Sequence, residues 1–221
     1  MGKHLEFDLR DLETALTVQA LAVEEMVQAA YEGLRTRSLG AAEEVFEREA
    51  EINRTEVLIE EQCLRMLAVH QPVAVDLRRV TSALKINSDL ERIGDLSLNL
   101  AERTEDLISH PETPIPDALA KMVRHALQML RDANRAFVDI DASLAESVCQ
   151  RDDEIDAMNR DVIRSLAQKM ESHPEQVSGL LHVFSASRIV ERIGDHATNI
   201  AEDVVYLARG EITRHHFNQT G

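Results

Sequence analysis

The sequence predicts an all-α fold made of two tandem three-helix bundle repeats with pseudo-two-fold symmetry. Gly (8) and Pro (5) are scarce in the 221 residues, whereas Ala, Leu, Glu, Arg and Met, which lose little side-chain entropy in a helix, are abundant. Apolar residues recur with helical periodicity along nearly the whole chain, and one five-residue motif occurs in both halves. Aromatic residues make up only 3% and Trp is absent, so a sheet stabilised by aromatic cross-strand pairs is disfavoured.

Breaker residues divide the periodic sequence into six predicted helices. We expect these helices at about residues 7–36, 42–69, 73–109, 115–141, 144–171 and 175–209. The strongest break is the segment 109–116, which contains three prolines and which we interpret as the linker between the repeats. This interpretation places the first repeat at residues 1–110 and the second at residues 111–221. Because the turns within each repeat are short, successive helices should pack as antiparallel neighbours.

The repeat is clearest in the third predicted helix of each half. Residues 91–95, with the sequence Glu-Arg-Ile-Gly-Asp, recur unchanged as residues 191–195, and three later positions of the same helix also match. Upstream, residues 45–53 align with residues 148–156. The glycine inside both motifs costs roughly 1 kcal/mol relative to Ala in a helix, so we expect a neighbouring helix to approach closely there.

Pairs of acidic residues one helical turn apart are the most unusual feature of these motifs. Glu91 and Asp95 share one face of their helix, and Glu191 and Asp195 share the equivalent face in the second repeat. Apolar residues occupy two sides of both helices, which is the pattern of a helix packed on two sides. The acids therefore interrupt a face that is elsewhere packed.

The preceding helix of each repeat supplies further acids. Antiparallel pairing about the turn places Glu49 opposite residue 92, and it places Asp152 and Asp156 opposite residues 194 and 190. Carboxylates gathered away from bulk water repel one another, and raised pKa values, salt bridges or bound cations can compensate for this repulsion. A network of salt bridges stays open as an alternative, because three arginines precede an acid by three residues: Arg92, Arg188 and Arg192.

We interpret the acids as two metal centres. All-oxygen ligand sets favour Mg, Mn, Fe or Ca, whereas Zn would normally recruit His or Cys as well. In the first repeat Glu49 is followed one turn later by the neutral Asn53, so we expect that centre to bind metal more weakly. The candidate metal ligands are Glu49, Asn53, Glu91, Asp95, Asp152, Asp156, Glu191 and Asp195.

Composition restricts the partners and the location. The formal net charge of −16, from 24 basic and 40 acidic residues, would repel nucleic acid, and few aromatic side chains are present on which bases could stack. No apolar run approaches the ~18–20 residues needed to cross a bilayer, and residues 1–8 contain no apolar signal core. Cys63 and Cys149 lie far apart without CxxC spacing, as expected of reduced core residues in a cytoplasmic protein.

Over essentially its whole length the chain resembles the PhoU family, through the doubled Glu-Arg-Ile-Gly-Asp motif and three acidic pairs with a spacing of four residues. Residues 75–79, Val-Asp-Leu-Arg-Arg, are also similar to the family. The resemblance implies paired three-helix bundles with multinuclear clusters of divalent or trivalent metal ions, such as Fe, Mn, Mg or Zn, at the acidic pairs.

The same resemblance implies a negative regulator of high-affinity phosphate uptake and of phosphate-starvation signalling. The partners that it implies are the ATPase subunit of the phosphate ABC transporter and the phosphate-sensing histidine kinase. A homodimer is a candidate assembly, and contact with the membrane is expected only through partners.

Two other functions stay open, a ferritin-like di-metal carboxylate enzyme and a metal-free helical adaptor. Ferritin-like sites need Glu-x-x-His on facing helices, and none of the nine histidines follows a Glu at that spacing. The sequence also lacks a GxxxxGK[ST] loop and a GxSxG motif, so we predict a protein that is not an enzyme, with no catalytic or organic cofactor-binding residues. His196 adjoins Asp195 but points about 100° from the acidic face, and Leu96 takes its place in the first repeat, so we expect an ordinary packing role for it.

Overall fold

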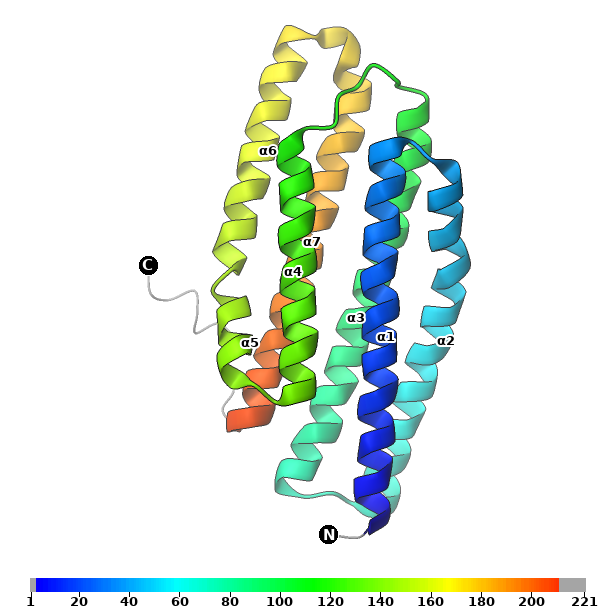
Figure 1. The fold of residues 1–221 in the computed structure, drawn as a ribbon, viewed down its shortest axis with the longest axis vertical. Coiled ribbons are helices and arrows are strands. Elements are labelled where there is room, and N and C mark those ends of the chain that lie inside the picture. The colour runs from blue at the N-terminus through cyan, green and yellow to red at the C-terminus, as the bar shows by residue number, and fades with distance from the viewer. Residues whose placement is uncertain (1–2, 211–221) are drawn as a thin grey trace.

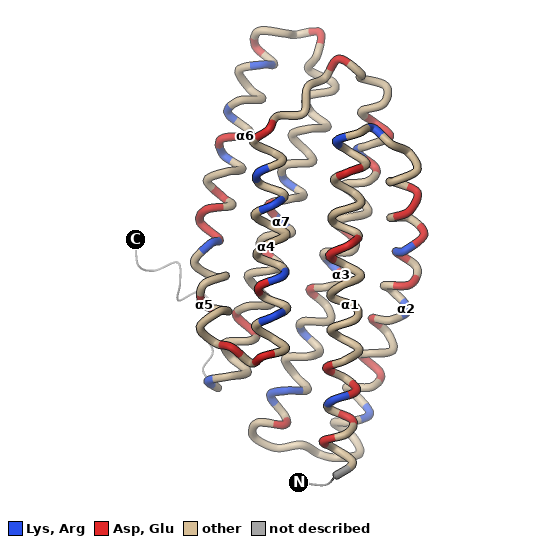
Figure 2. Tube along the Cα trace, in the orientation of Figure 1, with Lys and Arg blue, Asp and Glu red and all other residues tan. Residues whose placement is uncertain are grey.

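The computed structural model describes residues 3–210, and this range contains helices and no strand (Figure 1). The predicted all-α fold is therefore confirmed. Acidic and basic residues are distributed along the helices (Figure 2). The elements are α1 (Lys3–Thr36), α2 (Leu39–His70), α3 (Ala74–Ile108), α4 (Asp117–Asp139), α5 (Ala142–Cys149), α6 (Asp152–Ser172), a 3₁₀ turn η1 (Pro174–Gln176) and α7 (Val177–Arg209).

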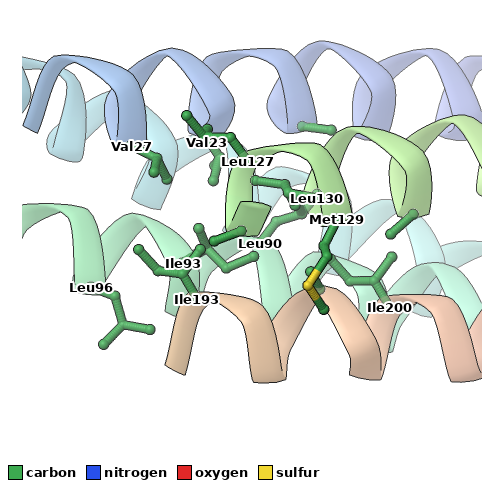
Figure 3. Close-up of a cluster of buried hydrophobic side chains, with 14 of the residues drawn as sticks. Val23, Val27, Leu90, Ile93, Leu96, Leu127, Met129, Leu130, Ile193 and Ile200 are labelled. Atoms are coloured by element: carbon green, nitrogen blue, oxygen red, sulfur yellow. The ribbon is translucent and has the colours of Figure 1, made fainter. Parts of the chain in front are cut away.

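Helices α3 and α7 lie at the centre of the bundle and join its two halves (Figure 1). The first repeat packs α1 and α2 on α3, and the second packs α4, α5 and α6 on α7. α3 and α7 run antiparallel and make the most extensive contact between any two helices of the described chain. Their completely buried Ile93 and Ile193 belong to one apolar cluster that also receives side chains from α1 and α4 (Figure 3). One continuous core therefore spans both repeats.

Side chains at the helix ends explain several of the boundaries. Ser38 caps α2 and Asp141 caps α5, since their side-chain oxygens accept hydrogen bonds from backbone N–H groups of the first turn. α7 ends at Gly210, whose φ of 76° lies in the left-handed region that suits glycine. None of the helices in the described range carries an apolar stretch long enough to cross a membrane.

The single helix predicted at 144–171 is instead two helices, α5 and α6. The backbone N–H of Arg151 bonds to the carbonyl of Val148, three residues back, at 2.9 Å, which tightens the chain at the end of α5. The Arg151 guanidinium donates to Asp132 of α4 at 2.7 Å and to the Ser147 carbonyl at 3.2 Å. This ion pair with α4 holds the chain at the break, whereas α2, the equivalent helix of the first repeat, is continuous.

The linker 109–116 is held between the two repeats. From the α1–α2 turn, Arg37 donates to the carbonyl oxygens of Leu107, at 3.3 Å, and Thr113, at 2.5 Å. The buried Thr113 side chain packs against Gly179 of α7, and a Cβ atom built on Gly179 would overlap Thr113 Oγ1. The missing side chain at Gly179 therefore lets the linker cross close to α7.

We expect Gly179→Ala to destabilise the protein by about 1–3 kcal/mol, the usual cost of overpacking. The new methyl group would overlap Thr113 Oγ1 and would also stand 2.9 Å from His110 Cβ. This clash should outweigh the roughly 1 kcal/mol by which Ala is favoured over Gly within a helix. Thermal and denaturant unfolding of the purified protein measure the change.

Gly40→Ala is the matched control, because the nearest atom to its new methyl group, Ser38 Oγ, would lie 3.9 Å away. This control should leave the stability unchanged or raise it. Adding Thr113→Ala to Gly179→Ala should recover part of the loss, since it removes the overlapping hydroxyl. A Gly179→Ala protein as stable as the Gly40→Ala protein would contradict the packing of the linker on α7.

Candidate metal centres

Two groups of acids lie along seams where helices of one repeat pack together. The first acidic cluster lies between α2 and α3, and the second acidic cluster lies between α6 and α7. We define the first as the predicted Glu49, Asn53, Glu91 and Asp95 together with Glu56; Glu56 acts on Glu91 across the seam, whereas Glu49 and Asn53 pair with each other within α2. The second comprises Asp152, Asp156, Glu191 and Asp195.

Close packing of α6 on α7 sets the geometry of the second acidic cluster. Ile155 fills the space beside Gly194, so that a Cβ atom on Gly194 would stand 2.6 Å from Ile155 Cδ1. Asp152 and Asp156 flank Ile155 in α6, and Asp152 accepts a hydrogen bond from Thr198 Oγ1 at 3.0 Å. Asp152 therefore lies opposite Thr198, about one turn further along α7 than the sequence pairing placed it.

The four acids of the second acidic cluster act on one another. Burial, followed by the charges of Glu191, Asp152 and Asp156, raises the pKa of Asp195 to about 6, although the residue is exposed by surface area and solvent screens part of this effect. Burial raises the pKa of Asp152 as well; the hydrogen bond from Thr198 opposes this shift and the charge of Asp156 adds to it. The structure thus brings the four predicted residues of this repeat together at a cost in charge repulsion.

Glu191 is the most buried member of the second acidic cluster. One carboxylate oxygen, Oε1, pairs with Arg188 at 2.5 Å. The other, Oε2, is buried and has no hydrogen-bond partner in the described structure. A buried carboxylate oxygen without a partner carries a desolvation penalty that a bound cation would remove. The donor set of this cluster therefore fits a metal ion.

The first acidic cluster is more fully paired. Asn53 donates to Glu49 Oε1 at 2.6 Å, so the amide acts there as a hydrogen-bond donor. Arg92 lies 3.6 Å from Glu91 Oε2 and 3.6 Å from Asp95 Oδ2, as the salt-bridge interpretation expected. Burial and the charge of Asp95 raise the pKa of Glu91, while Arg92 opposes the shift. Arg92 and Asn53 therefore already compensate much of the negative charge of this cluster.

Sequence reasoning missed Glu56, the α2 acid that adds to the rise in the pKa of Glu91. Ile52 packs on Gly94, whose added Cβ atom would lie 3.3 Å from Ile52 Cγ2, and this contact sets the register of α2 on α3. Buried Asn87 of α3 donates to the Glu56 carbonyl at 2.9 Å. The sequence spacing could have identified Glu56, because this residue follows Asn53 by three positions and so shares its face of the helix.

With Glu56 included, both clusters contain four carboxylates. The weaker affinity expected of the first centre stays a prediction, and the difference in protein partners between the two clusters supports it. Within residues 3–210, no three His, Cys, Asp or Glu side chains stand close enough together to hold one metal ion. Bridging a cation at either cluster would thus require the carboxylates to change rotamer.

His196 is not a member of either cluster, although its charge opposes the rise in the pKa of Asp195. Its Nδ1 atom lies 2.7 Å from Asp89 Oδ1 of α3, and Asn199 donates to the same oxygen at 3.3 Å. The ring points toward the other repeat, away from the acidic face of α7. His196 therefore has the packing role expected of it, with an ion-pairing partner that the sequence did not reveal.

Comparisons with known proteins agree on one family. The family model "PhoU domain" matches the chain twice, at residues 18–104 and 119–204. The "Phosphate-specific transport system accessory protein PhoU homolog" of Pseudomonas aeruginosa is 39% identical over 216 residues, which are 97% of this chain and 89% of that protein. The "Phosphate-specific transport system accessory protein PhoU" of Escherichia coli is 30% identical over 97% of this chain and 91% of its own length.

Solved structures show the same relationship. The crystal structure of PhoU from Pseudomonas aeruginosa superposes with a TM-score of 0.91 and 38% identity, over 93% of this chain and 99% of that one. The phosphate transport system regulatory protein PhoU from Streptococcus pneumoniae superposes with a TM-score of 0.88 and 29% identity, over 94% of this chain and 98% of that one.

Asp195→Asn is expected to raise the melting temperature at pH 7 when a chelator is present. The folded-state pKa of about 6 exceeds the ordinary value of 3.8, so the folded wild type binds more protons than the unfolded chain between these values and loses stability as the pH rises through them. The neutral amide removes that cost. The gain should be complete above about pH 7 and absent below about pH 4, as thermal unfolding across this range measures.

Asp95→Asn, at the equivalent position of the first repeat, is the matched control. Asp95 Oδ2 lies 3.6 Å from Arg92, so this substitution removes an attraction as well as the repulsion of Glu91, and any gain in melting temperature should be smaller than at Asp195. A gain of equal size in both variants, or a gain at Asp195 that is independent of pH, would contradict the charge repulsion assigned to the second acidic cluster.

Proposed function

The chain belongs to the PhoU family, and from that premise we propose that it is a negative regulator of high-affinity phosphate uptake and phosphate-starvation signalling. The observation that carries this proposal is the match of the family to both halves of the chain. Relatives named as accessory proteins of phosphate-specific transport also align over 97% of it. A regulatory role in phosphate uptake follows from membership of the family. The direction of that regulation, which is repression, and the identity of the partners are what we propose.

Regulation would act through protein contacts and not through catalysis. The proposed partners are the ATPase subunit of the phosphate ABC transporter and the phosphate-sensing histidine kinase, which the protein would meet in the cytoplasm. A homodimer is the proposed assembly. The net charge of −16 supports contact with basic partner surfaces, because a strongly charged surface steers association with the opposite charge. The division into repeats at residues 110 and 111 stays a prediction.

We further propose that the acidic clusters hold multinuclear centres of divalent or trivalent metal ions drawn from Fe, Mn, Mg and Zn. At the second cluster the ligands would be Asp152, Asp156, Glu191 and Asp195. At the first they would be Glu49, Asn53, Glu91 and Asp95, with Glu56 added by its effect on Glu91. Bound cations would neutralise facing carboxylates and so tie α2 to α3 and α6 to α7. The partnerless Glu191 Oε2 supports this proposal most directly.

The metal-free interpretation is a second candidate for the first acidic cluster alone. Arg92 pairs with Glu91 and Asp95, and Asn53 pairs with Glu49, so a cation would have to displace existing partners there. The second cluster offers a carboxylate oxygen that needs no displacement. The two clusters should therefore differ in affinity because of competing partners, although they carry the same number of acids.

Titration with Mn²⁺ should fill the second acidic cluster first. Glu191→Gln should remove the tighter binding phase, while Glu91→Gln, its counterpart in the first repeat, should leave that phase intact. Because a ligand of the folded state stabilises it by roughly 2.7 kcal/mol at 100 times Kd, chelation should lower the melting temperature and Mn²⁺ should restore it. Calorimetric titration and thermal unfolding measure the two effects.

Equal loss in both variants would show that competing partners do not decide the order of filling. A wild-type melting temperature that ignores both chelator and Mn²⁺ would favour salt bridges as the full account of the acids. Redox turnover of bound iron with dioxygen would instead support a ferritin-like enzyme.

Deletion of the gene in the organism that encodes the chain should raise uptake of radiolabelled phosphate in phosphate-rich medium, because the proposed regulator represses uptake. A wild-type copy should restore repression. The purified protein should also retain the transporter ATPase subunit of the same organism in a pull-down. Unchanged uptake after deletion, together with no retention of the ATPase subunit, would refute the proposed function.

A further inference from the structure

Two histidines meet where the linker crosses onto the second repeat. His110 lies at the end of α3, at the start of the linker, and His182 lies in the second turn of α7. Their ring centroids are 5.5 Å apart with an angle of 42° between the ring planes. The packing of the linker on Gly179 fixes this approach, since His110 Cβ would lie 2.9 Å from a Cβ atom at that position.

One residue, Asp106, orients both rings. His110 Nδ1 lies 3.0 Å from the Asp106 backbone carbonyl oxygen, and His182 Nδ1 lies 3.0 Å from Asp106 Oδ2. A carbonyl oxygen and a carboxylate can only accept a hydrogen bond, so both Nδ1 atoms must donate. In a neutral ring that assignment leaves the lone pair on Nε2. Arg103 Nη1, 3.0 Å from the same Oδ2 atom, holds the Asp106 carboxylate in place.

This arrangement has the features of histidines prepared to bind a metal ion. Metal-binding histidines generally donate their other ring N–H to a carboxylate or a backbone carbonyl, which fixes the tautomer and the ring orientation. Two imidazoles on one tetrahedral Zn²⁺, with Zn–N bonds of about 2.0–2.1 Å, have ring centroids roughly 5 Å apart. The observed separation of 5.5 Å is close to that value. The His182 side chain is 26% exposed, so an ion from solvent can reach the ring.

We propose that His110 and His182 form a two-imidazole site for a borderline transition-metal ion such as Zn²⁺, with Asp106 as the residue that positions both rings. Solvent would complete the coordination. The site is separate from the second acidic cluster, because Asp195 lies 13 positions after His182 in α7, which is about 20 Å along the helix axis. Its ligand chemistry also differs, since imidazoles select Zn²⁺, Ni²⁺ or Cu²⁺ over the harder Mg²⁺.

The consequence of binding is mechanical. His110 belongs to the joint between the repeats and His182 belongs to the helix at the centre of the second repeat, so a shared ion would fasten the linker to α7. Such an ion would add to the contacts of Arg37 and Thr113 that already hold the linker. The proposal stands without metal binding at the acidic clusters and without the proposed regulatory function.

The test is a calorimetric titration of the full chain with Zn²⁺ in excess Mg²⁺, which competes for carboxylate oxygens but poorly for imidazoles. His215 and His216 lie outside the described residues, and adjacent imidazoles bind Zn²⁺ themselves, so both are changed to Ala in every protein tested. In this background one Zn²⁺ per chain should bind in a phase that excess Mg²⁺ does not suppress. His110→Gln and His182→Gln should each weaken binding at least about tenfold, since even residues that only orient a ligand are worth about 10–100-fold.

His173→Gln is the matched control, because it removes an exposed histidine from the α6–α7 turn and should leave Zn²⁺ affinity unchanged. Asp106→Ala should weaken binding about tenfold, and Asp106→Asn should recover part of the loss, because an amide oxygen can still accept from His182. Affinities in the His110 and His182 variants equal to that of the His173 variant would overturn the proposal.

A second measurement avoids dependence on variants that fold poorly. Paramagnetic Co²⁺, added to the same background protein in excess Mg²⁺, should broaden the NMR ring signals of His110 and His182 before those of the other histidines. Broadening that begins at other rings, or that leaves these two sharp, would overturn the proposal as well.

Discussion

The antiparallel contact between α3 and α7 is the constraint on which the rest of the structure depends. Each of these helices is apolar on two sides, so each packs on its partner with one side and on its own repeat with the other. Ile93 and Ile193 are completely buried in the shared core. Only narrow edges of α3 and α7 remain for polar residues, and both acidic clusters lie on such edges, at the seams with α2 and α6.

The ion pairs across this contact are not repeated by the pseudo-two-fold symmetry. Asp89 meets His196 at 2.7 Å, and Lys85 meets the buried carboxylate of Asp203 at 2.8 Å. The pseudo-two-fold operation replaces the first of these pairs by Ile189 and Leu96, both buried and apolar. Because His182 of α7 also meets Asp106 of α3 at 3.0 Å, ion-pair contacts at both ends fix how far α7 can slide along α3. The two repeats therefore share a fold but contribute different residues to the contact between α3 and α7.

The sequence was sufficient for the fold but not for the register of facing helices. Periodicity and the doubled motif depend on local spacing, which a single sequence displays directly.

The register of α2 on α3 depends on the conformation of the turn between them. Gln71 in this turn and Ala74 at the start of α3 have left-handed φ values of 44° and 49°, and neither residue type predicts such a value. The predicted pairing of α2 with α3 was consequently displaced by roughly one helical turn, which hid Glu56. The break at Arg151 depends on Asp132 of another helix, and the meeting of His110 with His182 depends on the path of the linker. These are contacts between residues distant in sequence, and no local pattern contains them.

The repeats carry the same polar groups on their second long helix in exchanged order. Where the first repeat has Asn53 followed by Glu56, the aligned positions of the second have Asp156 followed by Asn159. The exchange moves one negative charge by three residues, or about 4.5 Å along the helix.

This exchange changes the partners of the acid. In the first repeat the acid is Glu56, which lies beside Asn87 and accepts hydrogen bonds from it. In the second repeat the acid stays beside Asp195 and contributes to the rise in its pKa, and buried Asn159 leaves its Oδ1 without a partner. The position of one carboxylate, and not the number of carboxylates, therefore distinguishes the electrostatics of the second cluster from those of the first.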